Sequence, residues 1–217
     1  VCVTVFLPTL PAGGWVVAEL RRRGIGKRIR FDGPESHHVK EGTPTMGGLV
    51  YLIAIIITVP AAAFFGDLLS AEVTVLLLVL AGYGLIGFLD DFIKVVLKRN
   101  LGLTSLQKLI AQIVIAVISF FLLSGIGFDT SLGIPFTGFS IELGALYVAF
   151  LIFWLVGFSN AVNLTDGLDG LVAGTASIAF AAFGIIAIHQ DQYGVLLFTF
   201  SVAGALLGFL VFNKYPA

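Results

Sequence analysis

Seven apolar stretches separated by polar segments dominate this 217-residue chain. A helix that crosses the hydrocarbon core of a membrane needs about 20 mostly apolar residues. Six stretches reach that length, and a partial one is weakened by two prolines and a Gly-Gly pair. The six cover residues 47–66, 71–89, 107–127, 141–161, 170–190 and 193–212, and the partial one covers 1–18. Because 58% of the residues are hydrophobic and only 12% are charged, we expect an all-α, polytopic transmembrane helical bundle of about seven spans.

Membrane-spanning β-strands would instead give alternating segments of about 10 residues, and the sequence lacks that pattern. The segment "FDTSLGIPFTGFS" at 128–140 mixes turn formers with β-branched and aromatic residues, so a short extracytoplasmic β-hairpin fits there. Residues 1–217 are expected to form a single integral membrane domain. Because the chain starts at Val1 and stops at Ala217, just after an apolar run, we expect that domain to be truncated at both ends.

The basic residues predict the orientation of the bundle. All twelve Lys and Arg residues follow the first, third and seventh stretches, whereas the opposite connections carry only acidic residues. Lys and Arg concentrate on the cytoplasmic side of membrane proteins, so we expect the basic connections to face the cytoplasm. The basic residues are Arg21, Arg22, Arg23, Lys27, Arg28, Arg30, Lys40, Lys94, Lys98, Arg99, Lys108 and Lys214.

Two adjacent carboxylates, Asp90 and Asp91, lie at the cytoplasmic end of the third stretch, in "GFLDDFIK". Mutual repulsion and the apolar surroundings both disfavour such a pair. A solvated helix end is one interpretation. The other is that Mg²⁺ with a phosphate group, or Lys94 one turn further on, offsets the charge. We favour metal and phosphate chemistry.

A second polar cluster, "FSNAVNLTDGLDGL", occupies residues 158–171. Its Asn and Asp residues recur every three positions, which places them along one face of a helix end or tight turn. Helix capping would account for one or two of them, but four exceed that need, and we therefore predict a binding site. The four are Asn160, Asn163, Asp166 and Asp169.

Four segments carry a family resemblance. They are "RFDGPESHHVKEGTPTMGG" (30–48), "GFLDDFIK" (87–94), "NLTDGLDGL" (163–171) and "NKYPA" (213–217). With these four motifs in this order, the chain resembles the phospho-N-acetylmuramoyl-pentapeptide-transferases. This ten-span family belongs to the polyprenyl-phosphate N-acetylhexosamine-1-phosphate transferase superfamily. The resemblance implies Mg²⁺-dependent transfer of phospho-MurNAc-pentapeptide from its UDP carrier to undecaprenyl phosphate, with release of UMP, in peptidoglycan synthesis.

The resemblance also implies roles for the matching residues. Asp90 and Asp91 would be catalytic and would bind the metal, and Asp166 would be catalytic as well. The implied substrate-binding residues are Lys40, Thr45, Lys94, Lys108, Asn163, Gly167, Leu168, Asp169 and Asn213. Our hypothesis makes Asp90 the general base on the lipid phosphate, while Asp91 helps to place Mg²⁺. A covalent phospho-aspartate is the competing route.

The implied partners are UDP-MurNAc-pentapeptide, undecaprenyl phosphate and the lipid bilayer of the bacterial cytoplasmic membrane. No nucleic acid is expected, and a homodimer is left open. In the family, a Gly-Asp segment associated with the metal and a histidine-rich loop follow the Pro-Ala pair, so we expect these 217 residues alone to be inactive. The alternatives are a sister polyprenyl-phosphate GlcNAc-1-phosphate transferase and an ion-coupled transporter, which would carry its acids in mid-span.

Overall fold

The computed structural model describes residues 2–22, 46–97, 101–134 and 136–214, and almost all of them are helical. The elements are α1 (Cys2–Arg22), α3 (Leu49–Phe65), α4 (Ala71–Val96), α5 (Ser105–Gly125), β1 (Ser131–Gly133), β2 (Ser140–Glu142), the 3₁₀ turn η1 (Gly144–Leu146), α6 (Tyr147–Thr165), α7 (Leu171–His189) and α8 (Tyr193–Asn213). The predicted all-α bundle is confirmed.

Five segments of the described chain are long and apolar enough to cross a membrane. They are α4, α5, the segment Gly144–Thr165 that contains η1 and α6, α7, and α8. Helix α3 is apolar but has only 17 residues. Helix α1 runs from Cys2 to Arg22 without a break, although its prolines predicted a weak span. The sequence predicted about seven spans, and these correspond to five candidate spans, one shorter apolar helix and α1.

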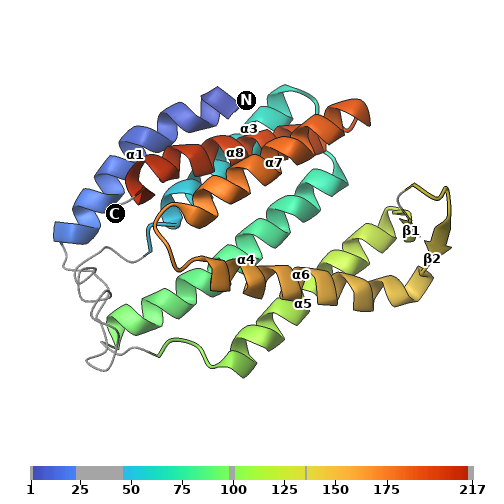
Figure 1. Cartoon of the computed structure of the whole chain (residues 1–217), viewed down its shortest axis with the longest axis horizontal. Coiled ribbons are helices and arrows are strands. Elements are labelled where there is room, and N and C mark those ends of the chain that lie inside the picture. Colours follow the sequence, from blue (N-terminus) through green and yellow to red (C-terminus); the bar gives the residue numbers. More distant parts are fainter. Residues whose placement is uncertain (1, 23–45, 98–100, 135, 215–217) are drawn as a thin grey trace.

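Successive helices run in opposite directions, so their connections alternate between two sides of the bundle (Figure 1). One side holds the end of α4, the connection 166–170 between α6 and α7, and the end of α8 at Asn213. We call it the motif side, because three of the four sequence motifs reach it. The β-hairpin lies on the other side. This alternation agrees with the segregation of basic and acidic residues in the sequence.

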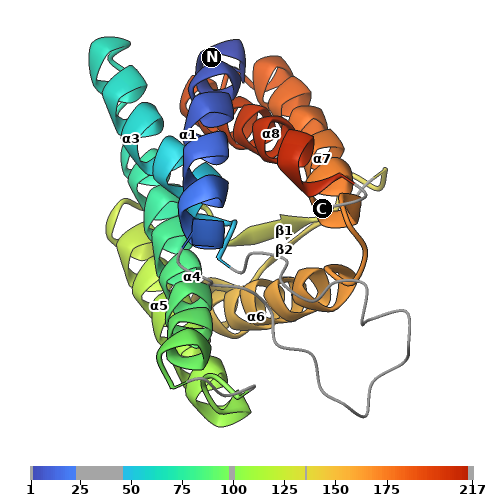
Figure 2. The same ribbon diagram turned by 90° about the vertical axis from the view of Figure 1, so that its left-hand side faces the viewer.

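Helix α8 is the centre of one half of the bundle, where it packs against α1, α3 and α7 (Figure 2). Its buried residues form a nearly unbroken run from Leu197 to Leu206, and most of its circumference is covered. Close van der Waals packing of this kind drives helix association inside a membrane, where apolar burial from water no longer operates between helices. The core of buried apolar residues comprises Val5, Ile55, Val59, Ala63, Val73, Leu197, Phe198, Val202, Ala205 and Leu206.

Helices α4, α5 and α6 form the other half, and they pack in chain order (Figure 2). Helix α4 packs against α5, and α5 packs against α6. Helix α6 differs from its neighbours because none of its residues is buried within the chain. Its orientation therefore depends on contacts along one narrow face, chiefly with α5.

The predicted hairpin is present between α5 and α6. Its antiparallel strands pair Ser131 with Glu142 and Gly133 with Ser140. Ahead of β1, the carboxylate of Asp129 accepts hydrogen bonds from the backbone N–H and the hydroxyl of Ser131, both at 2.8 Å. These bonds hold the pKa of Asp129 below its usual range.

Candidate active site

The carboxylate pair lies inside α4 and not at its end. The helix was expected to stop near residue 89, but it continues to Val96. Phe92, Ile93 and Val95 supply apolar surface beyond the carboxylates, and the i to i−4 bonding of the helix continues through them. Because neighbouring helical residues project about 100° apart, Asp90 and Asp91 face different surroundings.

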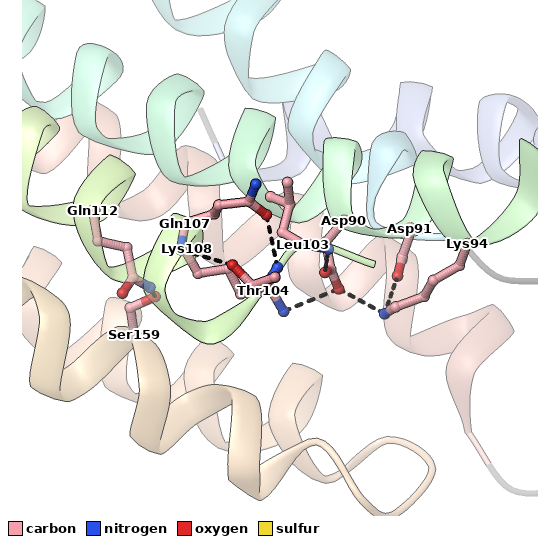
Figure 3. Close-up of polar contacts among 9 residues, drawn as sticks. All are labelled: Asp90, Asp91, Lys94, Leu103, Thr104, Gln107, Lys108, Gln112 and Ser159. Carbon is pink, nitrogen blue, oxygen red and sulfur yellow. Dashed lines mark hydrogen bonds and ion pairs between the residues drawn. The ribbon is translucent and has the colours of Figure 1, made fainter. Parts of the chain in front are cut away.

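Asp90 is buried, with 6% of its surface exposed, and it is held by three N–H donors (Figure 3). Its Oδ1 accepts the backbone N–H of Leu103 at 2.8 Å. Its Oδ2 lies 2.6 Å from Nζ of Lys94 and 3.0 Å from Nζ of Lys108. A buried carboxylate is tolerated only when paired and hydrogen-bonded, and these contacts meet that requirement. They also join α4 to the start of α5.

Asp91 is the accessible member of the pair. Its side chain is 38% exposed, and Oδ1 lies 3.1 Å from Nζ of Lys94. Lys94 thus bridges the two carboxylates from one turn further along the helix (Figure 3). The two ammonium groups of Lys94 and Lys108 offset the repulsion that makes an Asp-Asp pair unfavourable, and a metal ion is not needed to explain why the pair is tolerated.

The connection from α4 to α5 is fitted tightly around Asp90. A Cβ atom added at Gly102 would lie 2.3 Å from Oδ1 of Asp90 and 2.5 Å from its carbonyl oxygen, so only glycine fits there. Helix α5 then begins with a capping box, in which Thr104 and Gln107 satisfy each other's backbone N–H groups. Gly102 and Leu103 were not among the site residues predicted from the sequence. The signal was "LGLT", a glycine in a short connection beside charged residues.

The 158–171 motif divides between a helix end and a turn. Asn163 lies on α6, which ends at Thr165, and Asp166 is the residue after the helix. Asn163, Asp166, Gly167 and Leu168 are exposed, and Asp169 is half-buried. The exposed members present amide and carboxylate oxygens on the motif side. Asn160, the first of the predicted series, instead points to α5, where its Nδ2 donates to Oε1 of Gln112 at 3.3 Å.

Asn213 connects the end of α8 to this turn. Its Oδ1 accepts the backbone N–H of Gly170 at 3.0 Å. Gly170 has φ +76°, a left-handed conformation that favours glycine, and it precedes α7. A Cβ added there would meet Leu210 of α8 at 3.2 Å. Asn213, predicted to bind substrate, thus uses its side-chain oxygen to hold the 166–170 connection against α8.

The structure brings most of the described candidates to one side but not into one cluster. Asp90, Asp91, Lys94 and Lys108 form the α4–α5 cluster. The last turn of α6, with Asn163, and the connection 166–170, with Asp166 and Asp169, lie on the same side (Figure 1). Lys40 and Thr45 lie outside the described residues. Tyr51 on α3 follows that motif in the chain, and its hydroxyl lies within electrostatic range of Asp166.

Comparison with known proteins identifies the family. The sequence profile described as "Glycosyl transferase family 4" matches residues 73–217, which is about two thirds of the chain. The chain belongs to glycosyl transferase family 4. A second profile, "Phospho-N-acetylmuramoyl-pentapeptide-transferase signature 1", matches residues 40–52. The family match covers α4 to α8 and with them every described candidate residue, and the signature covers Lys40, Thr45 and Tyr51.

Individual proteins similar to this chain share one name. The chain is 56% identical over 212 residues to a protein of Geobacillus sp. strain WCH70, 54% identical to one of Bacillus anthracis and 55% identical to one of Geobacillus thermodenitrificans. Each is named phospho-N-acetylmuramoyl-pentapeptide-transferase. The aligned region covers 98% of this chain and 65% of each relative, so the chain spans about two thirds of the length of these proteins. The resemblance inferred from the motifs is confirmed.

The carboxylates of this family 4 site differ in their capacity to hold a metal. Among the residues that the structure describes, no group of three or more His, Cys, Asp or Glu side chains could hold a metal ion. Mg²⁺ usually takes one or two carboxylates and completes its shell with water and phosphate, so such a group is not required. Asp90 fits poorly, because both of its oxygens already accept N–H donors. Asp91 and Asp166 fit better, because both are accessible hard oxygen donors.

Proposed function

We propose that the chain is part of a phospho-N-acetylmuramoyl-pentapeptide-transferase of the bacterial cytoplasmic membrane. In this proposal, 1–217 belongs to one integral membrane domain, and its motif side faces the cytoplasm. The segregation of all twelve Lys and Arg residues supports that orientation. The shared name of the relatives supports UDP-MurNAc-pentapeptide and undecaprenyl phosphate as substrates. The observation that carries the chemistry is the pair of lysines held by one buried carboxylate beside an accessible one.

The reaction forms one P–O bond and breaks another. An oxygen of the lipid phosphate attacks the β-phosphorus of the UDP-sugar, and the bond from that phosphorus to the bridging oxygen breaks. UMP leaves with the bonding electrons. In this proposal Lys94 and Lys108 neutralise the charge of the diphosphate. Their ion pairs with Asp90 support it, because they hold both ammonium groups close together without substrate.

The exposure of the two carboxylates favours a revised division of roles. The sequence hypothesis gave Asp90 the part of general base, but a base must present a lone pair to the substrate. Asp90 is buried with both oxygens engaged, so we propose that it is a positioning residue. Asp91 is the accessible carboxylate and takes the base role. Its contribution is modest at neutral pH, because a phosphate monoester has a second pKa of about 6 and is already mostly ionised.

Mg²⁺ is part of the proposal on the basis of the donor set. Asp91 and Asp166 would hold the ion together with the diphosphate, and the ion when bound would supply Lewis-acid stabilisation of the leaving phosphate. Asn163, Gly167, Leu168 and Asp169 are proposed to contact the nucleotide part of the substrate.

The decisive assay measures UMP release by the intact protein in lipid vesicles that contain undecaprenyl phosphate. We expect UMP release with UDP-MurNAc-pentapeptide and Mg²⁺, and we expect the release to stop when a chelator removes the Mg²⁺. Asp91→Asn should lower kcat by about 100-fold or more, because it removes a carboxylate proposed to hold Mg²⁺ as well as the modest contribution of the base. Release only with UDP-GlcNAc would assign the sister transferase, and no release with either sugar nucleotide would overturn the proposal. Radiolabel trapped on the protein from β-labelled substrate without lipid would establish the covalent route.

A further inference from the structure

One buried amide connects three helices next to the carboxylate cluster. Gln112 of α5 is 6% exposed, and both ends of its side chain are hydrogen-bonded to α6. Its Nε2 donates to Oγ of Ser159 at 3.2 Å, and its Oε1 accepts Nδ2 of Asn160 at 3.3 Å. The backbone carbonyl of Gln112 also accepts the hydroxyl of Tyr83 on α4, at 3.2 Å. We call Gln112, Ser159, Asn160 and Tyr83 the amide clamp.

The amide clamp lies one helical turn from the catalytic cluster. Gln112 follows Lys108 by four residues, so both side chains lie on the same face of α5 (Figure 3). Tyr83 precedes Asp90 by seven residues, which is two turns of α4. Helices α4 and α5 are therefore joined at two levels, by Lys108 to Asp90 and by Gln112 to Tyr83. Only the second level also includes α6.

Helix α6 needs a directional contact more than its neighbours do. None of its residues is buried, although it packs against α5, so apolar packing constrains its rotation and register less than it does in helices with buried residues. Two consecutive residues, Ser159 and Asn160, bond to the same amide, and that arrangement fixes both. Asn163 follows Asn160 by less than one turn, and Asp166 ends the helix.

We propose that Gln112 is a positioning residue of the transferase, which sets the register of α6 so that Asn163 and Asp166 face the Asp90–Lys108 cluster. The inference rests on the proposed function. Gln112 itself makes no contact with substrate in this inference and acts only through Asn163 and Asp166. It also explains why Asn160, the first member of the regular Asn and Asp series, turns toward α5 and not toward the motif side.

The test compares Gln112→Met, which keeps the length of the side chain and removes its polar atoms, with Ser119→Ala. Ser119 is a matched control, because it is fully buried on α5 and its hydroxyl bonds only the Ile115 carbonyl of the same helix, at 2.8 Å. In the intact protein, we expect Gln112→Met to lower kcat about tenfold and to change KM by less than about threefold. Ser119→Ala should change neither. The double variant Gln112→Met/Asn160→Leu should be no worse than the poorer single variant.

A distance measurement separates positioning from general damage. Spin labels on cysteines introduced at Leu106 on α5 and Leu164 on α6, both exposed, would report the register without any substrate. Cys2 and every other native cysteine of the intact protein are replaced by serine in this background. Gln112→Met should broaden the distance distribution, and Ser119→Ala should leave it unchanged. A kcat loss with an unchanged distribution, or a broadened distribution with wild-type kcat, overturns the positioning role. Failure of the wild-type protein to release UMP overturns the proposed function instead, while the distances still decide whether the clamp sets the register of α6.

Discussion

Replacing Gly102 by alanine tests whether the α4–α5 connection holds Asp90 in place. The added Cβ would lie 2.3 Å from Oδ1 of Asp90 and 2.5 Å from its backbone oxygen. Ordinary contact needs about 3.5 Å, so the connection or the carboxylate must move by about 1 Å. That shift lengthens the 2.8 Å bond from the Leu103 N–H, which is worth about 1.5–3 kcal/mol because its acceptor is charged. Overpacking adds about 1–3 kcal/mol.

We therefore expect Gly102→Ala to destabilise this region by about 3 kcal/mol. A displacement of about 1 Å at a catalytic site costs about 100-fold in rate, so UMP release should fall by about that factor. The assay is UMP release by the intact protein, together with its half-inactivation temperature in detergent. Gly125→Ala is the matched control, because a Cβ there meets no atom within 4 Å, and its activity should equal that of the wild type. Wild-type activity and stability in Gly102→Ala would refute the reasoning.

Substitutions at Asn213, Lys94 and Lys108 test the polar contacts of the site. Asn213→Ala removes the acceptor for the Gly170 N–H and should lower the free energy of unfolding by about 1–2 kcal/mol. Asn213→Asp keeps an acceptor, so its free energy of unfolding should fall by less. Chemical denaturation compares the two variants. Lys94→Met or Lys108→Met leaves Asp90 with one ammonium partner. The double variant leaves Asp90 with none and should cost about 3–5 kcal/mol, more than the two single losses combined. Additive losses in a double-mutant cycle would contradict the shared role of Asp90.

The sequence predicts the large-scale arrangement well because length and charge determine it. Apolar runs of about 20 residues set the helices, and the segregation of Lys and Arg sets which ends share a side. The hairpin could also be predicted from the sequence, because "FDTSLGIPFTGFS" contains its turn and strand formers. The end of α4 was misplaced because Asp90 and Asp91 look like the border of a span. Hydrogen bonding continues the helix through them to Val96, with apolar residues beyond the charges.

The finer assignments depend on contacts that no local pattern records. Asp90 and Asp91 are neighbours in sequence, yet one faces α5 and the other is accessible, and their order alone does not reveal which. The bond from Gly170 to Asn213 joins residues 43 positions apart. Gly102 has a steric role that appears only when the connection is folded against the carboxylate. The motifs therefore predict a candidate site, while the proposed roles of its residues depend on the three-dimensional contacts.

The ion pair between Asp90 and Lys108 has a consequence for how the protein enters the membrane. Asp90 belongs to α4, but one of its two ammonium partners and its backbone donor arrive only with the residues that follow. During synthesis, α4 alone would bring a partly compensated carboxylate to the bilayer, which is unfavourable there. The two helices should consequently leave the translocation machinery together, as a pre-paired hairpin, and the short link around Gly102 would then close before either helix meets lipid on all sides.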